Sequence, residues 1–495
     1  MVIKTKENWE YGDFQTPKEL AERAVLKIQQ LNYQPNAIIE PTCGKGSFLI
    51  AASNIFPNVQ QLVGVDISGD YIQEISNQIS GLAIKDKIHL IQGDFFFIDW
   101  SCVLDSLPEP ILIVGNPPWV TSSELGIIQS GNLPEKSNFQ KRSGYDAITG
   151  KSNFDISEWM LLKHLDWLTY RRGMIAMLCK TSVARKALLH AWTHNLLISD
   201  ARMYLINAPK YFEASVDACF LIVNMLGKNN STDCCIYKSL EDKEPFKTIG
   251  YHDGKILADV DLFKKWRHLE GTDKYYRWRS GIKHDCSKII ELERRGHSQY
   301  SNGNHESVVL EENFIYPLLK SSDISNGKTR YGHKYMLVTQ KYIGEDTSLI
   351  ENIAPKTWHY LKKHERLLSK RASSVYIKHP KFSIFGVGDY SFSLWKVAIS
   401  GFYKQLSFKV VRPYEGKSVV FDDTVYFIPC LSESEANFIA SLLNSKQSQE
   451  FYSSMIFWDN KRPITIEVLK RLNLHKLSIE LNSEKDYLQF SKQLT

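Results

Sequence analysis

The sequence predicts an α/β protein built on an open, largely parallel sheet, followed by a second domain. Four short apolar runs within residues 37–114 have the character of buried strands, and an apolar helical pattern separates the first two. Glycine, acidic or amide residues follow each run directly, at the edge where open α/β sheets bind ligands. At 495 residues, the chain also exceeds the usual size of a single core.

The first predicted strand, residues 37–40, leads into a glycine-containing loop over residues 41–47 and a helix over residues 48–55. Gly44 and Gly46 let the backbone approach a ligand closely, and the N-terminus of the helix behind them favours a carboxylate. A Gly-x-Gly loop alone is weak evidence for any one cofactor, because a dehydrogenase would share it.

Acidic residues follow the second and third predicted strands. The strand over residues 62–65 ends at Asp66, about 20 residues beyond the glycine loop, where an acid can bind ribose hydroxyls. The strand over residues 88–91 is followed by Asp94 and Phe95, which offer an acceptor for an exocyclic amine and a ring to cover a base. An aspartate at a strand end often only caps the next helix. Capping does not explain the joint spacing of these two residues, so we favour the functional interpretation.

The fourth predicted strand, residues 111–114, ends at a rigid turn of sequence Gly-Asn-Pro-Pro-Trp. Pro117 and Pro118 fix two φ angles and remove two backbone donors. Asn116 adds a side-chain acceptor, and Trp119, expected to be exposed, adds a flat stacking face. Surface turns collect Pro and Asn in any case. Together with the three preceding strands, however, this turn suits a planar ring that carries an amino group.

These four elements occur in a fixed order, and the ordered set resembles the AdoMet-dependent amino-methyltransferases that act on nucleobases. The order is similar to the gamma arrangement of that family, in which an element holding the methionine end of the cofactor precedes the glycine loop. Residues 11–17 would be that element, leading into a helix over residues 18–30 with Thr16 as a candidate N-cap and Pro17 at the first helical position. The resemblance implies a Rossmann-like mixed sheet in residues 1–245 and an α+β target-recognition domain in residues 246–495.

The resemblance also implies which residues bind AdoMet. Asp66 takes the ribose hydroxyls, with Ile67 against the adenine. Asp94 accepts from the exocyclic amine of the cofactor, and Phe95 covers its ring. The implied surroundings of the methionine moiety are Phe14, Thr16, Glu40, Thr42, Gly44 and Gly46.

The same resemblance implies the catalytic residues, Asn116, Pro117, Pro118 and Trp119. The amine of adenine or cytosine is a poor nucleophile while its lone pair is conjugated with the ring. Acceptors at Asn116 Oδ1 and the Pro117 carbonyl would hold both amino hydrogens and turn the lone pair towards the methyl group. Trp119 would then stack on a base that has left the duplex. In the family this tetrapeptide goes mainly with adenine N6, whereas cytosine-N4 enzymes tend to begin it with Ser.

Further elements complete the predicted catalytic domain. Strands over residues 174–178 and 219–224 extend the sheet, and residues 234–237 form a candidate last strand. Phe212, just before the strand at 219, resembles the family phenylalanine that contacts the extruded base, although ordinary core packing explains it nearly as well. A helix beginning near residue 152 places Leu161, Leu165 and Leu168 on one face, and the resemblance places Asn153 and Asp155 at its start in the pocket wall.

Basic charge gathers in the second half of the chain. Residues 1–250 carry 24 Lys and Arg against 27 Asp and Glu, whereas residues 251–495 carry 37 against 28. Residues 361–420 alone hold 12 basic and 3 acidic side chains, interleaved with aromatic rings. This pattern is typical of a phosphate-contacting, base-reading surface, but a β-rich core with a solvated basic rim also produces it. The rings include Tyr376, Phe382, Phe385, Tyr390, Phe392, Trp395, Phe402, Tyr403 and Phe408, and residues 317–324, 382–390, 395–404 and 437–445 resemble target-recognition domains.

The expected surroundings follow from weaker signals. The eight cysteines show no Cys-x-x-Cys pairing, so we expect neither a metal site nor a disulfide framework. An N-terminus without an apolar signal core, and no run of transmembrane length, predict a reducing cytoplasm, bacterial if the resemblance holds. Double-stranded DNA is the expected partner, a separate cognate restriction endonuclease is a candidate one, and family enzymes of this arrangement often act as monomers.

Three alternatives remain open at this point. The first is methylation of an RNA base. The second is methylation of a protein glutamine, since some Asn-Pro-Pro-Tyr enzymes modify glutamine. The basic second half argues against a protein substrate. The third is a DNA-specificity subunit with a degenerate pocket, against which the intact turn at residues 116–119 argues. A fused nuclease is disfavoured, because the motifs begin within the first 16 residues.

Overall fold

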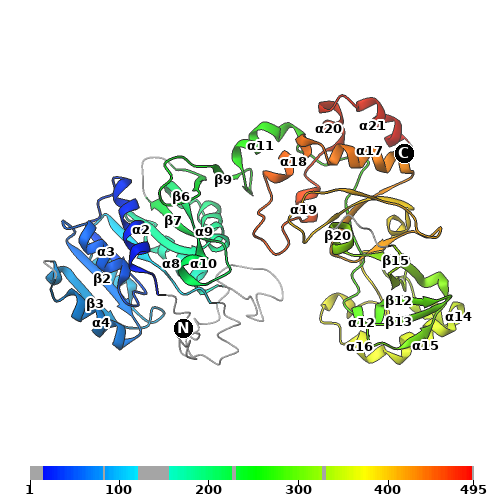
Figure 1. Ribbon diagram of the computed structural model, residues 1–495, viewed down its shortest axis with the longest axis horizontal. Helices are drawn as coiled ribbons and strands as arrows, with labels where there is room; N and C mark the ends of the chain where they lie inside the picture. The colour runs from blue at the N-terminus through cyan, green and yellow to red at the C-terminus, as the bar shows by residue number, and fades with distance from the viewer. Residues whose placement is uncertain (1–14, 82–83, 121–154, 226–229, 326–330, 493–495) are drawn as a thin grey trace. The chain divides into compact units, whose positions relative to one another are not determined.

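The computed structural model describes residues 15–81, 84–120, 155–225, 230–325 and 331–492. The chain divides into two compact units, Met1–Val260 and Asp261–Thr495 (Figure 1). The sequence had placed the boundary at 245/246, inside the first unit. The difference arises because β9 (Lys247–His252) and β10 (Lys255–Leu257) extend the sheet of the first unit beyond β8 (Asp233–Tyr237), the expected last strand.

In the described residues, the first unit contains a ten-stranded mixed sheet of order β10-β9-β8-β6-β7-β5-β4-β1-β2-β3. The five strands from β5 to β3 in this order run parallel, whereas β7 runs antiparallel to both of its neighbours, β5 and β6. Chain order reverses between β1 and β4, and such a switch point is where α/β sheets bind ligands. The strands are β1 (Ala37–Glu40), β2 (Gln61–Asp66), β3 (Ile88–Gln92), β4 (Ile111–Gly115), β5 (Gly173–Lys180), β6 (Ile198–Ile206) and β7 (Ala218–Met225).

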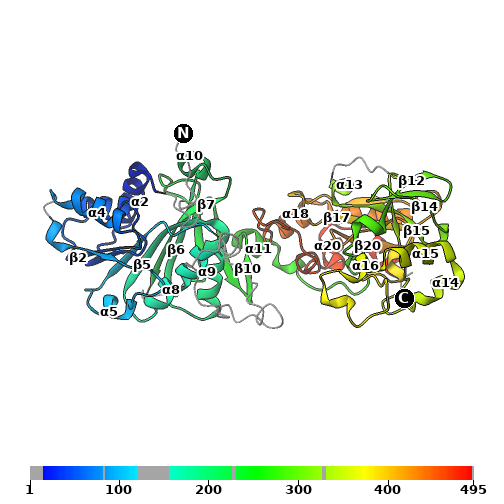
Figure 2. The same ribbon diagram turned by 90° about the horizontal axis from the view of Figure 1, so that it is seen from below.

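Helices cover both faces of this sheet, so its central strands are buried on both sides (Figure 2). On one face, α2 (Lys18–Gln30), α3 (Ser47–Ile55) and α4 (Gly69–Ile79) enclose a core to which Leu20, Leu49 and Ile75 belong. The other face carries α5 (Trp100–Asp105), α8 (Ile156–Trp167) and α9 (Thr181–Thr193). Continuous apolar runs along β1, β4 and β5 therefore reflect burial from two sides.

The start of α2 differs from the expected capping. The helix begins at Lys18, as predicted, but Pro17 occupies the N-cap position and no side chain caps the helix. Thr16 is instead held through its carbonyl oxygen, which accepts a hydrogen bond of 2.7 Å from Ser47 Oγ. The segment before α2 is thereby joined to the glycine loop.

The second unit is α+β, as predicted, with two sheets in its described residues. One has the order β11-β20-β17-β18 and the other β14-β13-β12-β16-β15-β19. Helix α17 (Glu433–Leu443) packs against the first sheet, and α15 (Pro355–Lys363) lies beside β14 of the second. The strands are β11 (Arg279–Ser280), β12 (Glu291–Gly296), β13 (Gln299–Asn302), β14 (Ser307–Val309), β15 (Ile315–Leu319), β16 (Lys334–Leu337), β17 (Trp395–Ser400), β18 (Lys409–Val411), β19 (Val420–Phe421) and β20 (Val425–Cys430). The remaining helices are α11 (Val260–Trp266), α12 (Ser287–Ile290), α13 (Ser321–Ser325), α14 (Ile350–Ile353), α16 (Glu365–Ser369), α18 (Lys446–Ser453), α19 (Ile466–Leu469), α20 (Leu474–Glu480) and α21 (Glu484–Ser491).

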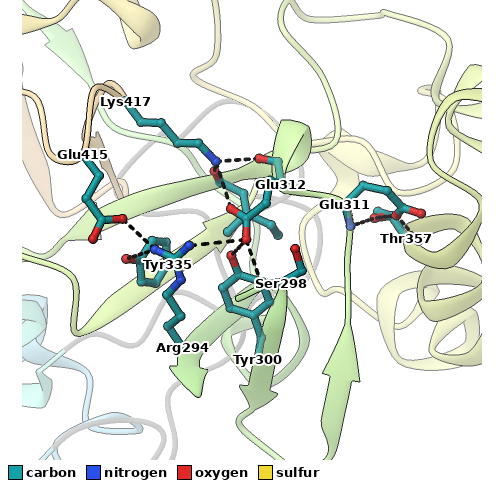
Figure 3. Close-up of polar contacts among 10 residues, drawn as sticks. Arg294, Ser298, Tyr300, Glu311, Glu312, Tyr335, Thr357, Glu415 and Lys417 are labelled. Atoms are coloured by element: carbon teal, nitrogen blue, oxygen red, sulfur yellow. Dashed lines mark hydrogen bonds and ion pairs between the residues drawn. The ribbon is translucent and has the colours of Figure 1, made fainter. Parts of the chain in front are cut away.

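A carboxylate at Glu312 organises one end of the six-stranded sheet (Figure 3). Its Oε1 accepts a hydrogen bond of 2.7 Å from the hydroxyl of Tyr300 and lies 3.4 Å from the guanidinium of Arg294. Its Oε2 pairs with Lys417 at 3.1 Å. Arg294 also pairs with Glu415 at 2.7 Å. The charges of Arg294 and Lys417 are therefore neutralised within the unit.

All eight cysteines are free, and Cys43, Cys179 and Cys234 are among the buried ones. Burial raises the pKa of the Cys43 and Cys234 thiols, so both stay protonated at neutral pH. Among the described residues, none of the helices combines the length and apolar character needed to cross a bilayer.

Candidate active site

A pocket lies at the carboxyl edge of the parallel strands, where the turns after β1, β2, β3 and β4 meet. Of the predicted site residues, its wall contains Thr16, Glu40, Thr42, Gly44, Asp66, Ile67, Asp94, Phe95, Asn116 and Pro118. Gln15, Ser47 and Met160, which the sequence analysis did not select, line it as well. Gly46, Pro117, Trp119 and Phe212 lie outside the wall, and Phe14 falls outside the described residues.

Both loop glycines adopt left-handed backbone conformations, with φ of +50° at Gly44 and +76° at Gly46. A Cβ added at Gly44 would lie 2.8 Å from the side-chain amide of Gln15, and one at Gly46 would lie 2.9 Å from Ile75 Cγ1. Only glycine combines this backbone with such close neighbours. The close approach that the sequence ascribed to a ligand is thus made, in part, by protein atoms.

Two polar contacts hold the pocket floor against the glycine loop. Glu40 is buried, and its Oε2 accepts a hydrogen bond of 2.8 Å from the backbone N–H of Leu49 in the first turn of α3. Burial raises the pKa of the Glu40 carboxyl. The side-chain oxygen of Gln15 accepts from the backbone N–H of Lys45 at 3.0 Å. The segment before α2 and the end of β1 therefore enclose the loop from two sides.

The two predicted nucleoside-binding aspartates have defined orientations. Asp66 accepts from the N–H of Gly44 through Oδ2 (2.7 Å) and from the N–H of Ser68 through Oδ1 (2.9 Å). Ser68, not Asp66, is the N-cap of α4. Asp94 Oδ1 accepts from the N–H of Phe96 at 2.9 Å. Simple helix capping therefore does not explain Asp66, and both carboxylates belong to the pocket wall.

Phe95 contributes to the wall but is mostly core. Its ring is 6% exposed and packs among aromatic neighbours, with centroid distances of 5.1 Å to Trp100, 5.6 Å to Trp167 and 5.9 Å to His164. Sequence reasoning missed this cluster, although Trp167 lies on the helix whose leucine face was predicted. His164 is buried, and desolvation lowers its pKa to about 3.

The Asn-Pro-Pro-Trp turn follows β4, and Asn116 is half-buried at the pocket wall. Trp119 is 5% exposed, which corrects the expected exposed indole. Its ring meets Phe212, the last residue of α10 (Ala208–Phe212), at 5.0 Å between centroids and an interplanar angle of 63°. The two rings predicted separately to contact the target base are therefore in direct contact with each other.

Comparisons with known proteins decide the family. The family model described as N-6 DNA Methylase matches residues 3–276. The Type II methyltransferase M.NspV from Nostoc sp. is 45% identical over 479 residues, which cover 96% of this chain and 98% of that protein. The chain belongs to the N-6 DNA methylase family. The predicted enzyme class, an AdoMet-dependent DNA methyltransferase of adenine N6, is thereby confirmed.

Other similarities to this N-6 DNA methylase are more partial. The Type II methyltransferase M.BanIII from Aneurinibacillus aneurinilyticus is 29% identical over 161 residues, 29% of this chain and 27% of that protein. The Type IIL restriction-modification enzyme MmeI, solved in complex with DNA, superposes with a TM-score of 0.51 at 14% identity. That match covers 92% of this chain but 64% of the MmeI chain, and it shows a shared fold.

Lys180, at the end of β5, contacts the Asn-Pro-Pro-Trp turn beside the candidate site, and sequence reasoning missed it. Its Nζ donates a hydrogen bond of 3.2 Å to the carbonyl of Trp119 and one of 2.6 Å to Asp155 Oδ2. Asp155 in turn accepts from the N–H of Ser157 at the start of α8, whereas Asn153 lies outside the described residues. The sequence did offer one indication of this role, because Lys180 is the single charged residue of β5 and stands at its end.

In the second unit of the N-6 DNA methylase, the pattern of basic and aromatic residues has two components. Phe382 and Phe408 are buried, and so is Lys396, whose Nζ donates to the carbonyl oxygen of Val419 at 2.9 Å. These residues agree with the alternative interpretation of the pattern, a β-rich core with a solvated basic rim. Phe402 and Tyr403 are exposed, as a nucleic-acid surface requires. The segment is therefore part core and part surface.

Proposed function

We propose that this enzyme methylates the N6 atom of an adenine rotated out of duplex DNA, at sites selected by the second unit. One observation carries the proposal. Asn116 and Pro118 of the turn after β4 and the two aspartates after β2 and β3 line a single pocket. A target amine held at the turn and a nucleoside cofactor held by the aspartates would then be neighbours.

The donor set of the pocket fits AdoMet. Carboxylates on adjacent strand ends suit the ribose hydroxyls and the exocyclic amine of a nucleoside, and the N-terminus of α3 suits a carboxylate. When bound, AdoMet supplies an electrophilic methyl group. The residues proposed to hold it are Thr16, Glu40, Thr42, Gly44, Gly46, Asp66, Ile67, Asp94 and Phe95, and Phe14 retains this assignment as a prediction.

The turn itself activates the target amine. Asn116 Oδ1 and the Pro117 carbonyl accept the two amino hydrogens and withdraw the nitrogen lone pair from ring conjugation. The two prolines hold these acceptors rigidly, so little reorganisation is needed during transfer. Trp119 and Phe212 grip the extruded base. Because Trp119 is 5% exposed and faces Phe212, their contact must open as the base enters.

The biological setting is proposed on the same basis. Near full-length similarity to a Type II methyltransferase supports a role beside a cognate restriction endonuclease in a bacterial cytoplasm. We propose a monomer, which matches an asymmetric recognition unit acting on one strand at a time.

Methyl transfer to DNA tests the proposal. Labelled AdoMet is incubated with genomic DNA that lacks adenine methylation, and the products are digested to nucleosides and mapped. The expected result is N6-methyladenine confined to one short sequence. In the matched Asn116→Ala enzyme we expect transfer to be lost while AdoMet affinity, measured by calorimetry, persists. Transfer to RNA or peptide but not to DNA, or an active Asn116→Ala enzyme, would contradict the proposal.

A further inference from the structure

A basic loop, residues 370–381, follows α16 in the second unit. Residues 366–388 around it contain five Lys or Arg and no Asp or Glu. A segment that carries charge of one sign attracts a polyanion. The loop has no role in the site described above.

The base of the basic loop is held rigidly by Arg371. Its guanidinium donates to the carbonyl oxygens of Leu368 (2.7 Å), Ser383 (2.7 Å) and His284 (3.3 Å). The same group lies 3.6 Å from the centroid of the Tyr376 ring. An arginine that binds three carbonyl oxygens and stacks on a ring fixes the path of the loop, whose only regular element among the described residues is a 3-10 turn at Ser374–Tyr376.

A second set of contacts supports the loop from below. Phe385 packs edge-on against Tyr376 at 5.2 Å and against His379 at 4.9 Å between ring centroids. The Tyr376 hydroxyl donates to the carbonyl oxygen of Lys283 at 3.4 Å. The loop is therefore pre-organised, and binding through it would cost little ordering entropy.

Several side chains of the loop are exposed and make no stabilising polar contact. Ile377 is 79% exposed. Lys370 and Lys378 are exposed, and among the described residues neither side-chain amine has a hydrogen-bond or ion-pair partner. By contrast, Lys381 pairs with Glu365 at 2.6 Å. The loop thus carries two ammonium groups without side-chain partners and one exposed aliphatic side chain.

We propose that the basic loop contacts duplex DNA, with Lys370 and Lys378 on backbone phosphates and Ile377 against the base or sugar edges of the groove. Ammonium groups contact phosphates as point charges, which gives affinity without sequence preference. An aliphatic side chain reads the shape and methyl groups of a groove, which gives discrimination. The inference rests on the proposed function, because it assigns part of the DNA surface of that enzyme.

The salt dependence of DNA affinity tests the lysines. The dissociation constant of the full-length enzyme for fragments of unmethylated genomic DNA is measured across a series of NaCl concentrations, with S-adenosylhomocysteine present. Each lost phosphate contact lowers the slope of log affinity against log salt by about 0.9, so Lys370→Ala/Lys378→Ala should lower it by roughly 1.8. The control Lys264→Ala/Lys485→Ala removes the same charge from exposed positions on α11 and α21 and should leave the slope nearly unchanged.

The role of Ile377 is tested by how well the enzyme distinguishes its own site from an altered one. With duplexes carrying the mapped site or one altered base pair, Ile377→Ser should reduce the ratio of the two kcat/KM values by about tenfold at an unchanged salt slope. Ile353→Ser, at another exposed position on α14, is the control and should keep the ratio. Wild-type slope and ratio in the loop variants would overturn the inference while leaving the proposed function intact. A wild-type enzyme that neither binds nor methylates DNA, but methylates RNA, would overturn both.

Discussion

Single residues of the glycine loop show how the local backbone conformation limits which residues can stand at the proposed AdoMet site. Gly46 combines φ of +76° with a neighbour, Ile75 Cγ1, that would lie 2.9 Å from an added Cβ. Gly254, in the turn between β9 and β10, has nearly the same φ of +74° but no neighbour within 4 Å of an added Cβ. The pair therefore separates backbone strain from steric overlap.

We predict that Gly46→Ala destabilises the enzyme more than Gly254→Ala. The left-handed backbone costs an alanine roughly 1–2 kcal/mol at either position, and only Gly46→Ala adds the overlap with Ile75. Urea unfolding of both variants measures the difference, and calorimetry measures the weaker AdoMet binding expected of Gly46→Ala alone. Equal losses of stability would show that Ile75 yields without cost.

Lys180 provides a second test at this scale, because we expect it to position the turn that is proposed to be catalytic. Lys180→Met removes the donor to the Trp119 carbonyl and leaves Asp155 without its cation. Because displacement of a reacting group by about 1 Å costs up to roughly 100-fold in rate, we expect kcat to fall between 10-fold and 100-fold while the AdoMet dissociation constant is kept. Lys180→Arg should restore part of kcat. A loss confined to thermal stability would indicate a purely structural role.

At the scale of elements, helix α8 carries a buried aromatic cluster against α5. His164 lies in this cluster, and among the described residues neither of its ring nitrogens has a hydrogen-bond partner. Desolvation lowers its pKa to about 3, against 6.5 for the unfolded chain. Below pH 6.5 the unfolded state therefore binds a proton at His164 that the folded state does not bind. The free energy of unfolding falls for this reason as the pH decreases, until the folded state also takes up the proton at about pH 3.

We predict that His164→Phe reduces the acid sensitivity of the enzyme. At pH 5, the histidine costs the wild type about 2 kcal/mol of unfolding free energy relative to pH 7.5, and phenylalanine removes that term. Chemical unfolding of both proteins at the two pH values gives the comparison. Parallel losses of stability in the two proteins would show that His164 finds a hydrogen-bond partner in the folded state.

The elements also show which parts of the fold a sequence can reveal. Strands β1, β4 and β5 are covered on both faces, so their burial appears as unbroken apolar runs. The sequence analysis missed β6, because Asp200 and Arg202 interrupt its apolar residues where the strand is only partly buried. Strand β10, at the edge of the sheet, and its neighbour β9 are short and carry still less signal, which displaced the predicted boundary.

The candidate site divides in the same way. Residues that follow a strand end, such as Asp66, Asp94 and Asn116, were predictable because parallel strands bring their carboxyl ends to one edge. The burial of Trp119 and the role of Lys180 depend on partners far away along the chain, Phe212 and Asp155 among them. Local patterns carry no information about such pairs.

At the scale of the whole molecule, chemistry and charge lie in different units. Every residue of the pocket wall belongs to the first unit, as does the core cluster behind it. Net positive charge belongs to the second half, with 37 basic against 28 acidic residues in 251–495. The two properties should therefore be separable by truncation.

We predict that residues 1–260 fold alone and bind AdoMet nearly as well as the full chain, but bind DNA weakly and with a shallower dependence on salt. Calorimetry with AdoMet and DNA titrations at several NaCl concentrations measure the two affinities. A folded fragment with no affinity for AdoMet, or with undiminished affinity for DNA, would contradict this separation.

The buried amine of Lys396 can report how often the four-stranded sheet opens, through the rate at which a reagent modifies it. Burial lowers its pKa to about 7, so a large share of the group is the reactive free base at neutral pH. Acylating reagents nevertheless cannot reach it while β17 stays paired with β18 and β20. Exposed lysines such as Lys370 should be modified at a rate set by the reagent, whereas modification of Lys396, followed by mass spectrometry, should proceed only as fast as the sheet opens.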